Sequence, residues 1–135
     1  MRKTFALALL ILATALLAIR AQANTCTAKR LKVKHVCGVV VDGSGVPIQG
    51  VTLQLISEKD EPLTSQTVTP GNGHFSLENA PEGDMFLAIF APQQNRGRWP
   101  LRVSGKMNVG QCTKPLKVHL AGRLGWACGD WVDQK

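Results

Sequence analysis

Residues 38–53 have the sequence Gly38-Val-Val-Val-Asp-Gly-Ser-Gly-Val-Pro-Ile-Gln-Gly-Val-Thr-Leu53, and this stretch decides the fold. It contains two apolar segments with a short run rich in glycine and proline between them. Valine favours a pleated strand, whereas glycine and proline favour a tight turn. The stretch therefore predicts a strand, a turn and a second strand, which is a common unit of small β-sandwiches.

The first 23 residues have the composition of a secretory signal peptide. Arg2 and Lys3 are followed by a mainly apolar run from Phe5 to Ile19 and by Ala21-Gln22-Ala23, which fits a cleavage site. The apolar run is shorter than the ~18 residues that a membrane span needs. We therefore predict a signal peptide at residues 1–23, a secreted protein (periplasmic or extracellular), and no transmembrane anchor after cleavage.

The remainder of the chain is long enough for one domain. We predict a β-sandwich domain at residues 24–121 and a tail packed on it at residues 122–135. The full chain has 16 basic and 9 acidic residues, a net charge of +7, and loss of Arg2, Lys3 and Arg20 with the signal lowers it to +4. This modest positive charge is compatible with an anionic polysaccharide as partner and does not indicate specific nucleic-acid binding.

Four cysteines follow the signal, and an even number in an exported chain predicts two disulfides. They are Cys26, Cys37, Cys112 and Cys128. Four cysteines allow three pairings, and we favour Cys37–Cys128 with Cys26–Cys112, because Cys128 would then hold the tail against the outer face of the first strand. No Cys-x-x-Cys pair occurs, and the histidines have no zinc-site spacing, so we expect no metal and no cofactor.

Seven segments have the composition of strands, and turn-forming residues separate them. They are residues 31–42, 51–57, 65–69, 74–78, 85–91, 99–104 and 116–120. Short strands at spacings of about ten residues are typical of a sandwich or barrel. We therefore predict an all-β fold, a seven-stranded antiparallel β-sandwich of Greek-key type with a disulfide-tethered C-terminal tail.

Two of the predicted strands are apolar on both faces, so a further segment must cover their outer side. They are residues 31–42 and 85–91, and Phe86 and Phe90 share the outer face of the second. The tail contains Trp126 and Trp131 and has the right composition to cover these phenylalanines. If it did not, they would form an apolar patch for a partner or ligand; we favour cover by the tail.

The motif that begins at Gly38 resembles the carboxypeptidase regulatory-like domain, a family of the transthyretin-like (prealbumin-like) β-sandwiches. The resemblance continues through Thr67-x-Thr69, Gly73-x-Phe75-x-Leu77 and Pro81-x-Gly83, and Met85 stands where that family usually has a tyrosine. These residues form turns and core and do no chemistry. The resemblance therefore implies a fold, a secreted or cell-surface location, and a role as a non-catalytic binding or structural interaction module with an extracellular protein or glycan partner.

Catalysis is the function that the sequence supports least. Some transthyretin-like sandwiches hydrolyse 5-hydroxyisourate with histidines, an arginine and a C-terminal Tyr-Arg-Gly-Ser motif, whereas this chain contains no tyrosine. His35, His74 and His119 could supply acid–base groups if they converged, but all three fall on predicted outer positions of strands. We predict no enzyme and no catalytic residues, and a hydrolase of this class is a distant alternative.

Two basic clusters are candidate binding sites. One comprises Arg96, Arg98, Trp99 and Arg102, where guanidinium groups beside an exposed indole ring would contact sulfate, phosphate or sugar. The other comprises Lys29, Arg30, Lys32 and Lys34, although alternating lysines also protect an edge strand from pairing. As the alternative function we therefore predict a carbohydrate- or polyanion-binding module that uses the first cluster.

Overall fold

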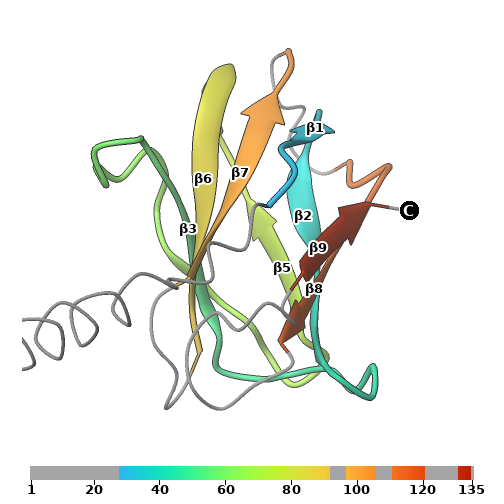
Figure 1. The fold of residues 1–135 in the computed structure, drawn as a ribbon. Coiled ribbons are helices and arrows are strands. Elements are labelled where there is room, and N and C mark those ends of the chain that lie inside the picture. The colour runs from blue at the N-terminus through green and yellow to red at the C-terminus, as the bar shows by residue number, and fades with distance from the viewer. Residues whose placement is uncertain (1–27, 92–96, 106–110, 121–130, 135) are drawn as a thin grey trace, which may run out of the picture.

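The computed structural model of the chain describes residues 28–91, 97–105, 111–120 and 131–134. In these ranges nine strands form two sheets that face each other (Figure 1). The strands are β1 (Leu31–Val33), β2 (Val36–Asp42), β3 (Thr52–Ile56), β4 (Thr67–Val68), β5 (His74–Leu77), β6 (Gly83–Phe90), β7 (Gly97–Val103), β8 (Leu116–Leu120) and β9 (Trp131–Gln134). The same ranges contain no helix long and apolar enough to cross a bilayer.

One sheet has five strands in the order β1-β7-β6-β3-β4, and the other has four in the order β5-β2-β8-β9. The prediction of an all-β sandwich is therefore confirmed, but the strand count of seven is wrong. Pairing is also not purely antiparallel, because β1 lies parallel to β7 and β2 lies parallel to β8. Strand β1 is thus an edge of the larger sheet, and β9 is an edge of the smaller one.

The first predicted strand, residues 31–42, is two strands that belong to different sheets. The chain bends at Lys34 and His35, so β1 pairs in the five-stranded sheet and β2 in the four-stranded one. Val33 before the bend and Val36 after it are 2% and 0% exposed. Val33 and Val36 are three positions apart, so in one straight strand their side chains would point to opposite faces of the sheet. The bend between them allows both side chains to be buried in the same core.

The stretch from Gly38 to Leu53 forms the predicted strand, turn and strand, but its two strands lie in different sheets. Its turn is local: the Asp42 carboxylate accepts hydrogen bonds from the amides of Ser44 and Val46, at 2.8 and 2.9 Å. Gly45 has a φ of 82°, which glycine adopts without steric cost. After the turn the chain crosses to the opposite sheet, so this unit joins the two layers.

Thr69 fixes that crossing and is the buried polar residue of the described core, at 2% exposure. Its hydroxyl donates to the Ile48 carbonyl at 2.7 Å and accepts from the Val51 amide at 3.0 Å. The Thr69 amide in turn donates to the Val51 carbonyl at 2.9 Å. A buried polar group is stable when its hydrogen bonds are made, and here they hold the start of β3 in place.

The core lies between the sheets and takes its side chains from both. The larger sheet contributes residues such as Leu53, Leu55, Met85, Leu87 and Leu101, and the smaller contributes Val36, Val40, Leu116 and Val118, all at most 1% exposed. Burial of one such side chain stabilises the fold by about 1.5–3 kcal/mol. Met85, which stands where the resembling family has a tyrosine, is an ordinary member of this core.

The described end of the tail is a strand. Residues 131–134 form β9, which runs antiparallel to β8 and places Val132 opposite Val118. The tail was predicted to cover Phe86 and Phe90; its described part, β9, belongs to the four-stranded sheet, whereas those two residues lie on β6 of the five-stranded sheet. Both phenylalanines are half-buried, and the guanidinium of Arg98 lies over the Phe86 ring at 4.7 Å. Trp126 lies outside the described residues.

Candidate functional site

The structure separates the residues of the predicted arginine and tryptophan site. Arg98 and Arg102 point outward from β7, whereas Trp99 is half-buried and packs against the core beside its partner Leu87. Side chains alternate between the two faces of a strand, so neighbours in the sequence cannot share one face. Arg96 lies outside the described residues. The indole ring is therefore not beside the guanidinium groups.

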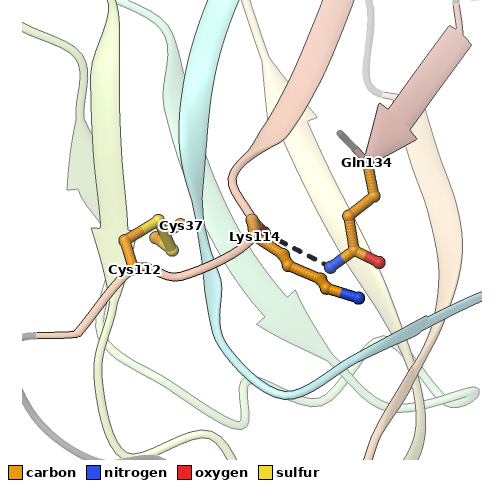
Figure 2. The surroundings of a disulfide bond; sticks show 4 residues. All are labelled: Cys37, Cys112, Lys114 and Gln134. Atoms are coloured by element: carbon orange, nitrogen blue, oxygen red, sulfur yellow. Dashed lines mark hydrogen bonds between the residues drawn. A yellow bond between two sulfur atoms is a disulfide. The ribbon is translucent and has the colours of Figure 1, made fainter.

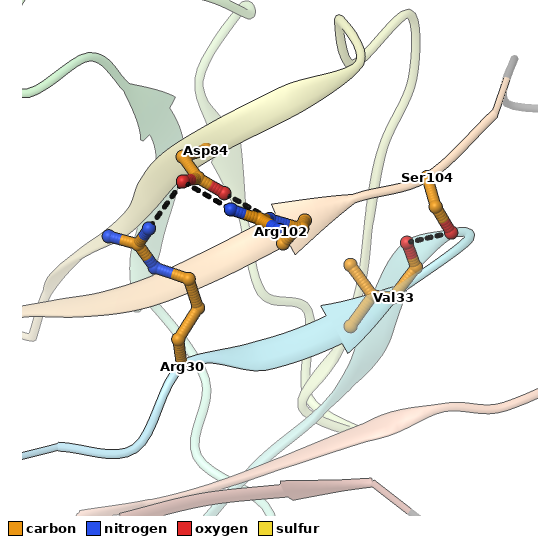
Figure 3. Close-up of polar contacts among 5 residues, drawn as sticks. All are labelled: Arg30, Val33, Asp84, Arg102 and Ser104. Atoms are coloured by element: carbon orange, nitrogen blue, oxygen red, sulfur yellow. Dashed lines mark hydrogen bonds and ion pairs between the residues drawn. The ribbon is translucent and has the colours of Figure 1, made fainter.

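The described arginines of that cluster are bound to carboxylates. Arg98 forms an ion pair with Asp60 at 3.1 Å. Arg102 donates from two nitrogens to the two oxygens of Asp84, and its Nη2 lies 2.8 Å from Oδ2. Arg30, from the other basic cluster, contacts the same carboxylate (Figure 3). The hydrogen bond from Arg102 and the charges of Arg102 and Arg30 lower the pKa of Asp84 below its ordinary value.

The Cys37–Cys128 pairing predicted from the sequence is wrong, because Cys37 is bonded to Cys112 (Figure 2). Cys37 lies on β2 and is 3% exposed. Strand β8 runs parallel to β2, so the chain that enters β8 passes Cys37, and the two Cα atoms lie 6.0 Å apart. Cys26 and Cys128 lie outside the described residues, as do the predicted signal peptide and its cleavage site.

A basic cavity of about 300 Å³ lies at the side of the sandwich where the edge strands β1 and β9 are found. Its walls come from the end of β1, the end of β7, the segment before β8 and the end of β9. The lining residues are Lys32, Val33, Lys34, His35, Ser104, Thr113, Lys114 and Gln134. Segments that are about a hundred residues apart in the sequence thus share one cavity.

Two hydrogen bonds and a disulfide join the segments that form the walls of the basic cavity. The Ser104 amide donates to the Val33 carbonyl at 2.9 Å, which joins the ends of β7 and β1 (Figure 3 shows both residues). The Gln134 side-chain amide donates to the Lys114 carbonyl at 3.3 Å, which joins β9 to the segment before β8 (Figure 2). The disulfide at Cys112 fixes the same segment to β2. The segments that form the cavity are therefore fixed to the two sheets.

The charge of the basic cavity is uncompensated within the part of the chain that the structure describes. Lys32, Lys34 and Lys114 line it, and no aspartate or glutamate does. None of these lysines forms an ion pair with a described carboxylate, in contrast to the three arginines above. An anion that entered the cavity would therefore meet a lining whose described residues include three lysines and no carboxylate.

The sequence pointed to only part of this cavity. Lys32 and Lys34 belong to the predicted lysine cluster, but Thr113 and Lys114 carried no signal, because they precede a strand whose partner was unknown. The parallel pairing of β2 with β8 places them beside the start of β2. No sequence pattern specifies such a pairing, so only the sheet order could have indicated them.

The three histidines do not converge. His35 lines the basic cavity, whereas His74 and His119 lie on β5 and β8, on either side of β2. His119 Nε2 lies 3.4 Å from an Asp133 oxygen, on the outer face of the smaller sheet. Among the described residues, no three or more histidine, cysteine, aspartate or glutamate side chains are grouped closely enough to hold a metal ion.

The two sheets and this cavity define a β-sandwich with a basic site at one edge. No family model matches the chain, and no curated protein matches it. Among solved structures it is similar to 5-hydroxyisourate hydrolase of Klebsiella pneumoniae, with 19% identity and a TM-score of 0.52, over 76% of this chain and 99% of that one. At this identity the likeness concerns the fold.

This neighbour corrects the expectation that the chain is no enzyme. That expectation rested on the absence of tyrosine and on a family whose shared motif is structural. A solved protein of the same fold is a hydrolase, so the architecture gives no ground for excluding catalysis. The disulfide between Cys37 and Cys112 is compatible with the predicted export, because such bonds persist in oxidising compartments.

Proposed function

We propose that this protein is an exported binding module, of the carboxypeptidase regulatory-like kind, that binds an anionic glycan in the basic cavity. The observation that carries the proposal is that Lys32, Lys34 and Lys114 line one cavity of about 300 Å³ and that no described residue of its lining is a carboxylate. The proposal retains the anionic polysaccharide as partner and moves its binding from Arg98, Trp99 and Arg102 to the lysines.

Size and polarity support a sugar-sized ligand. The cavity volume lies at the lower end of the range of about 300–1,000 Å³ for small-ligand sites, which suits one charged sugar unit better than a long segment of chain. Ser104 and Thr113 supply hydroxyl groups that can donate to or accept from sugar hydroxyls. The remaining units of a longer glycan would extend into solvent along the exposed edge.

Calorimetric titration with a heparin-derived hexasaccharide tests this proposal. Lys34→Gln and Lys114→Gln should each weaken binding about five-fold, since one lysine near an anionic surface contributes about 1 kcal/mol. Lys59→Gln is the matched control, because Lys59 is exposed on the β3–β4 connection and does not line the cavity. Raising the salt from about 50 to about 500 mM should weaken wild-type binding strongly. Equal losses in all three variants would mean that only net charge matters.

A hydrolase is the second candidate, favoured by the His119–Asp133 pair and by the hydrolase that shares the fold. A carboxylate that orients an imidazole is a frequent arrangement in general base catalysis. The neighbour's substrate class, 5-hydroxyisourate, is the first compound to test, by its ultraviolet absorbance decay. Wild-type acceleration that is lost in His119→Gln would support this candidate, and decay at the uncatalysed rate would remove it.

A further inference from the structure

The cations of the basic cavity differ from the cation that binds Asp84 on the larger sheet. Arg102 donates one hydrogen bond to each oxygen of the planar Asp84 carboxylate, from two different nitrogens. A guanidinium suits this task, because its fork of donors matches two coplanar oxygens. Among the described residues that line the cavity, the cations are three lysines and none is an arginine. The described lining therefore does not present the guanidinium fork with which Arg102 binds the carboxylate of Asp84.

Lysine ammonium groups bind as point charges from independent directions. Lys32 and Lys34 approach the cavity from β1 and the bend that follows it, and Lys114 approaches from the segment before β8. The hydroxyl of Ser104 adds a donor on a further wall segment at the end of β7, and the hydroxyl of Thr113 adds one beside Lys114. Donors that come from several sides match a group whose acceptor oxygens also point in several directions.

We infer that the basic cavity is a site for a tetrahedral oxyanion, a sulfate or phosphate ester carried on a sugar. Such an ester presents three terminal oxygens that diverge from one atom, one for each ammonium group. A carboxylate presents only two, in a plane. The inference rests on the proposed function, because it names the group through which the anionic glycan would be held.

Charge favours the phosphate ester in particular. The described lining of the cavity has three lysines and no carboxylate. A phosphate monoester carries about −1.5 to −2 at pH 7 and so compensates more of this charge than a single carboxylate does. A sulfate ester carries a single negative charge, as a carboxylate does, and differs from it by its third terminal oxygen.

Three monosaccharides that share one ring test the inference: glucose 6-phosphate, glucose 6-sulfate and glucuronate. They are titrated at constant ionic strength by calorimetry or by amide chemical shifts, with inorganic phosphate as a fourth ligand. Both esters should bind at least about ten-fold more tightly than glucuronate, since each offers a third terminal oxygen for one more charge-assisted hydrogen bond. Inorganic phosphate that binds as well as the sugar phosphate would still support the oxyanion site and would identify the free ion as sufficient.

Single lysine variants distinguish binding in the basic cavity from non-specific attraction to the positive charge of the protein. Lys32→Gln, Lys34→Gln and Lys114→Gln should each reduce ester affinity about five-fold or more, whereas Lys59→Gln should leave it within about two-fold. Amide shifts should centre on residues 113–114 and 32–35. Shifts spread over the whole basic surface would overturn the site.

The outcomes distinguish this inference from the proposed function. Glucuronate that binds within about two-fold of the esters would overturn the oxyanion site, while lysine-dependent binding would keep the anionic-glycan function. A hexasaccharide that binds when all monosaccharides fail would also overturn the oxyanion site, because the ester would then supply too little of the affinity. Failure of the hexasaccharide itself would overturn the proposed function, and the inference with it.

Discussion

Replacing both Cys37 and Cys112 by alanine should lower the free energy of unfolding by about 4 kcal/mol. The two residues are 75 positions apart, and the chain-entropy relation for a loop of this size gives about 4.5 kcal/mol at 25 °C. Alanine is the appropriate replacement because Cys37 is 3% exposed, and a serine hydroxyl there would add the cost of burying a polar group.

Urea unfolding followed by tryptophan fluorescence measures this loss. With a slope of about 1.5–2 kcal/mol/M, the midpoint should fall by about 2–3 M. Because the bond acts by restricting the unfolded chain, the native fluorescence spectrum should change little. A peptide map made without reduction provides the control, and it should contain one linked pair that joins Cys37 to Cys112.

Two results would refute this reasoning. One is a peptide map in which Cys37 is joined to Cys26 or Cys128. The other is a double variant that loses less than about 1 kcal/mol, which is far below the range of 2–5 kcal/mol for native disulfides in small secreted domains.

Three further perturbations test the fold. The pKa of Asp84 is lowered in the folded protein, so its ion pairs stabilise the fold at pH values above the ordinary carboxyl pKa and lose this effect as the pH falls through the pKa of the folded state. The melting temperatures of wild type and Asp84→Asn should therefore converge at acid pH. A difference that stays constant with pH would contradict this. Gly38→Ala should abolish or severely reduce folding, because the new Cβ would lie 1.8 Å from the Leu116 carbonyl oxygen, and circular dichroism of the purified variant measures it. Thr69→Val should cost about 1–3 kcal/mol in urea unfolding, because it removes the acceptor of the Val51 amide; a loss under about 0.5 kcal/mol would show that this bond is dispensable.

Local patterns in the sequence were sufficient to predict most of the strands and turns that make up the two sheets. The strand segments 51–57 and 116–120 were predicted from composition and turn residues, and their alternating residues Leu53, Leu55, Leu116 and Val118 are fully buried. The turn after Asp42 was also predictable, since glycine and proline positions fix it through backbone geometry alone. These features depend on residues within one strand or turn of each other, and so they are recorded in short stretches of sequence.

The errors share one physical origin, which is pairing between distant segments. The bend between Val33 and Val36 looked like continuous strand, because nothing local distinguishes a strand that changes sheets from one that continues. The disulfide of Cys37 depends on the parallel neighbour β8, and the tail became β9 because β8 offered a free edge. Each outcome depends on which distant segments lie side by side in the sheets, and short stretches of sequence do not specify that.

The candidate site divides in the same way. The sequence by itself determined that this chain is an all-β sandwich with a basic surface, because strand periodicity, turn residues and charge are local properties. The tertiary structure alone decided which cations are available for binding: Arg98 and Arg102 form ion pairs with Asp60 and Asp84, whereas Lys32, Lys34 and Lys114 line a cavity whose described residues include no carboxylate. The reason is that ion pairing depends on distances between side chains that only the assembled sheets bring together.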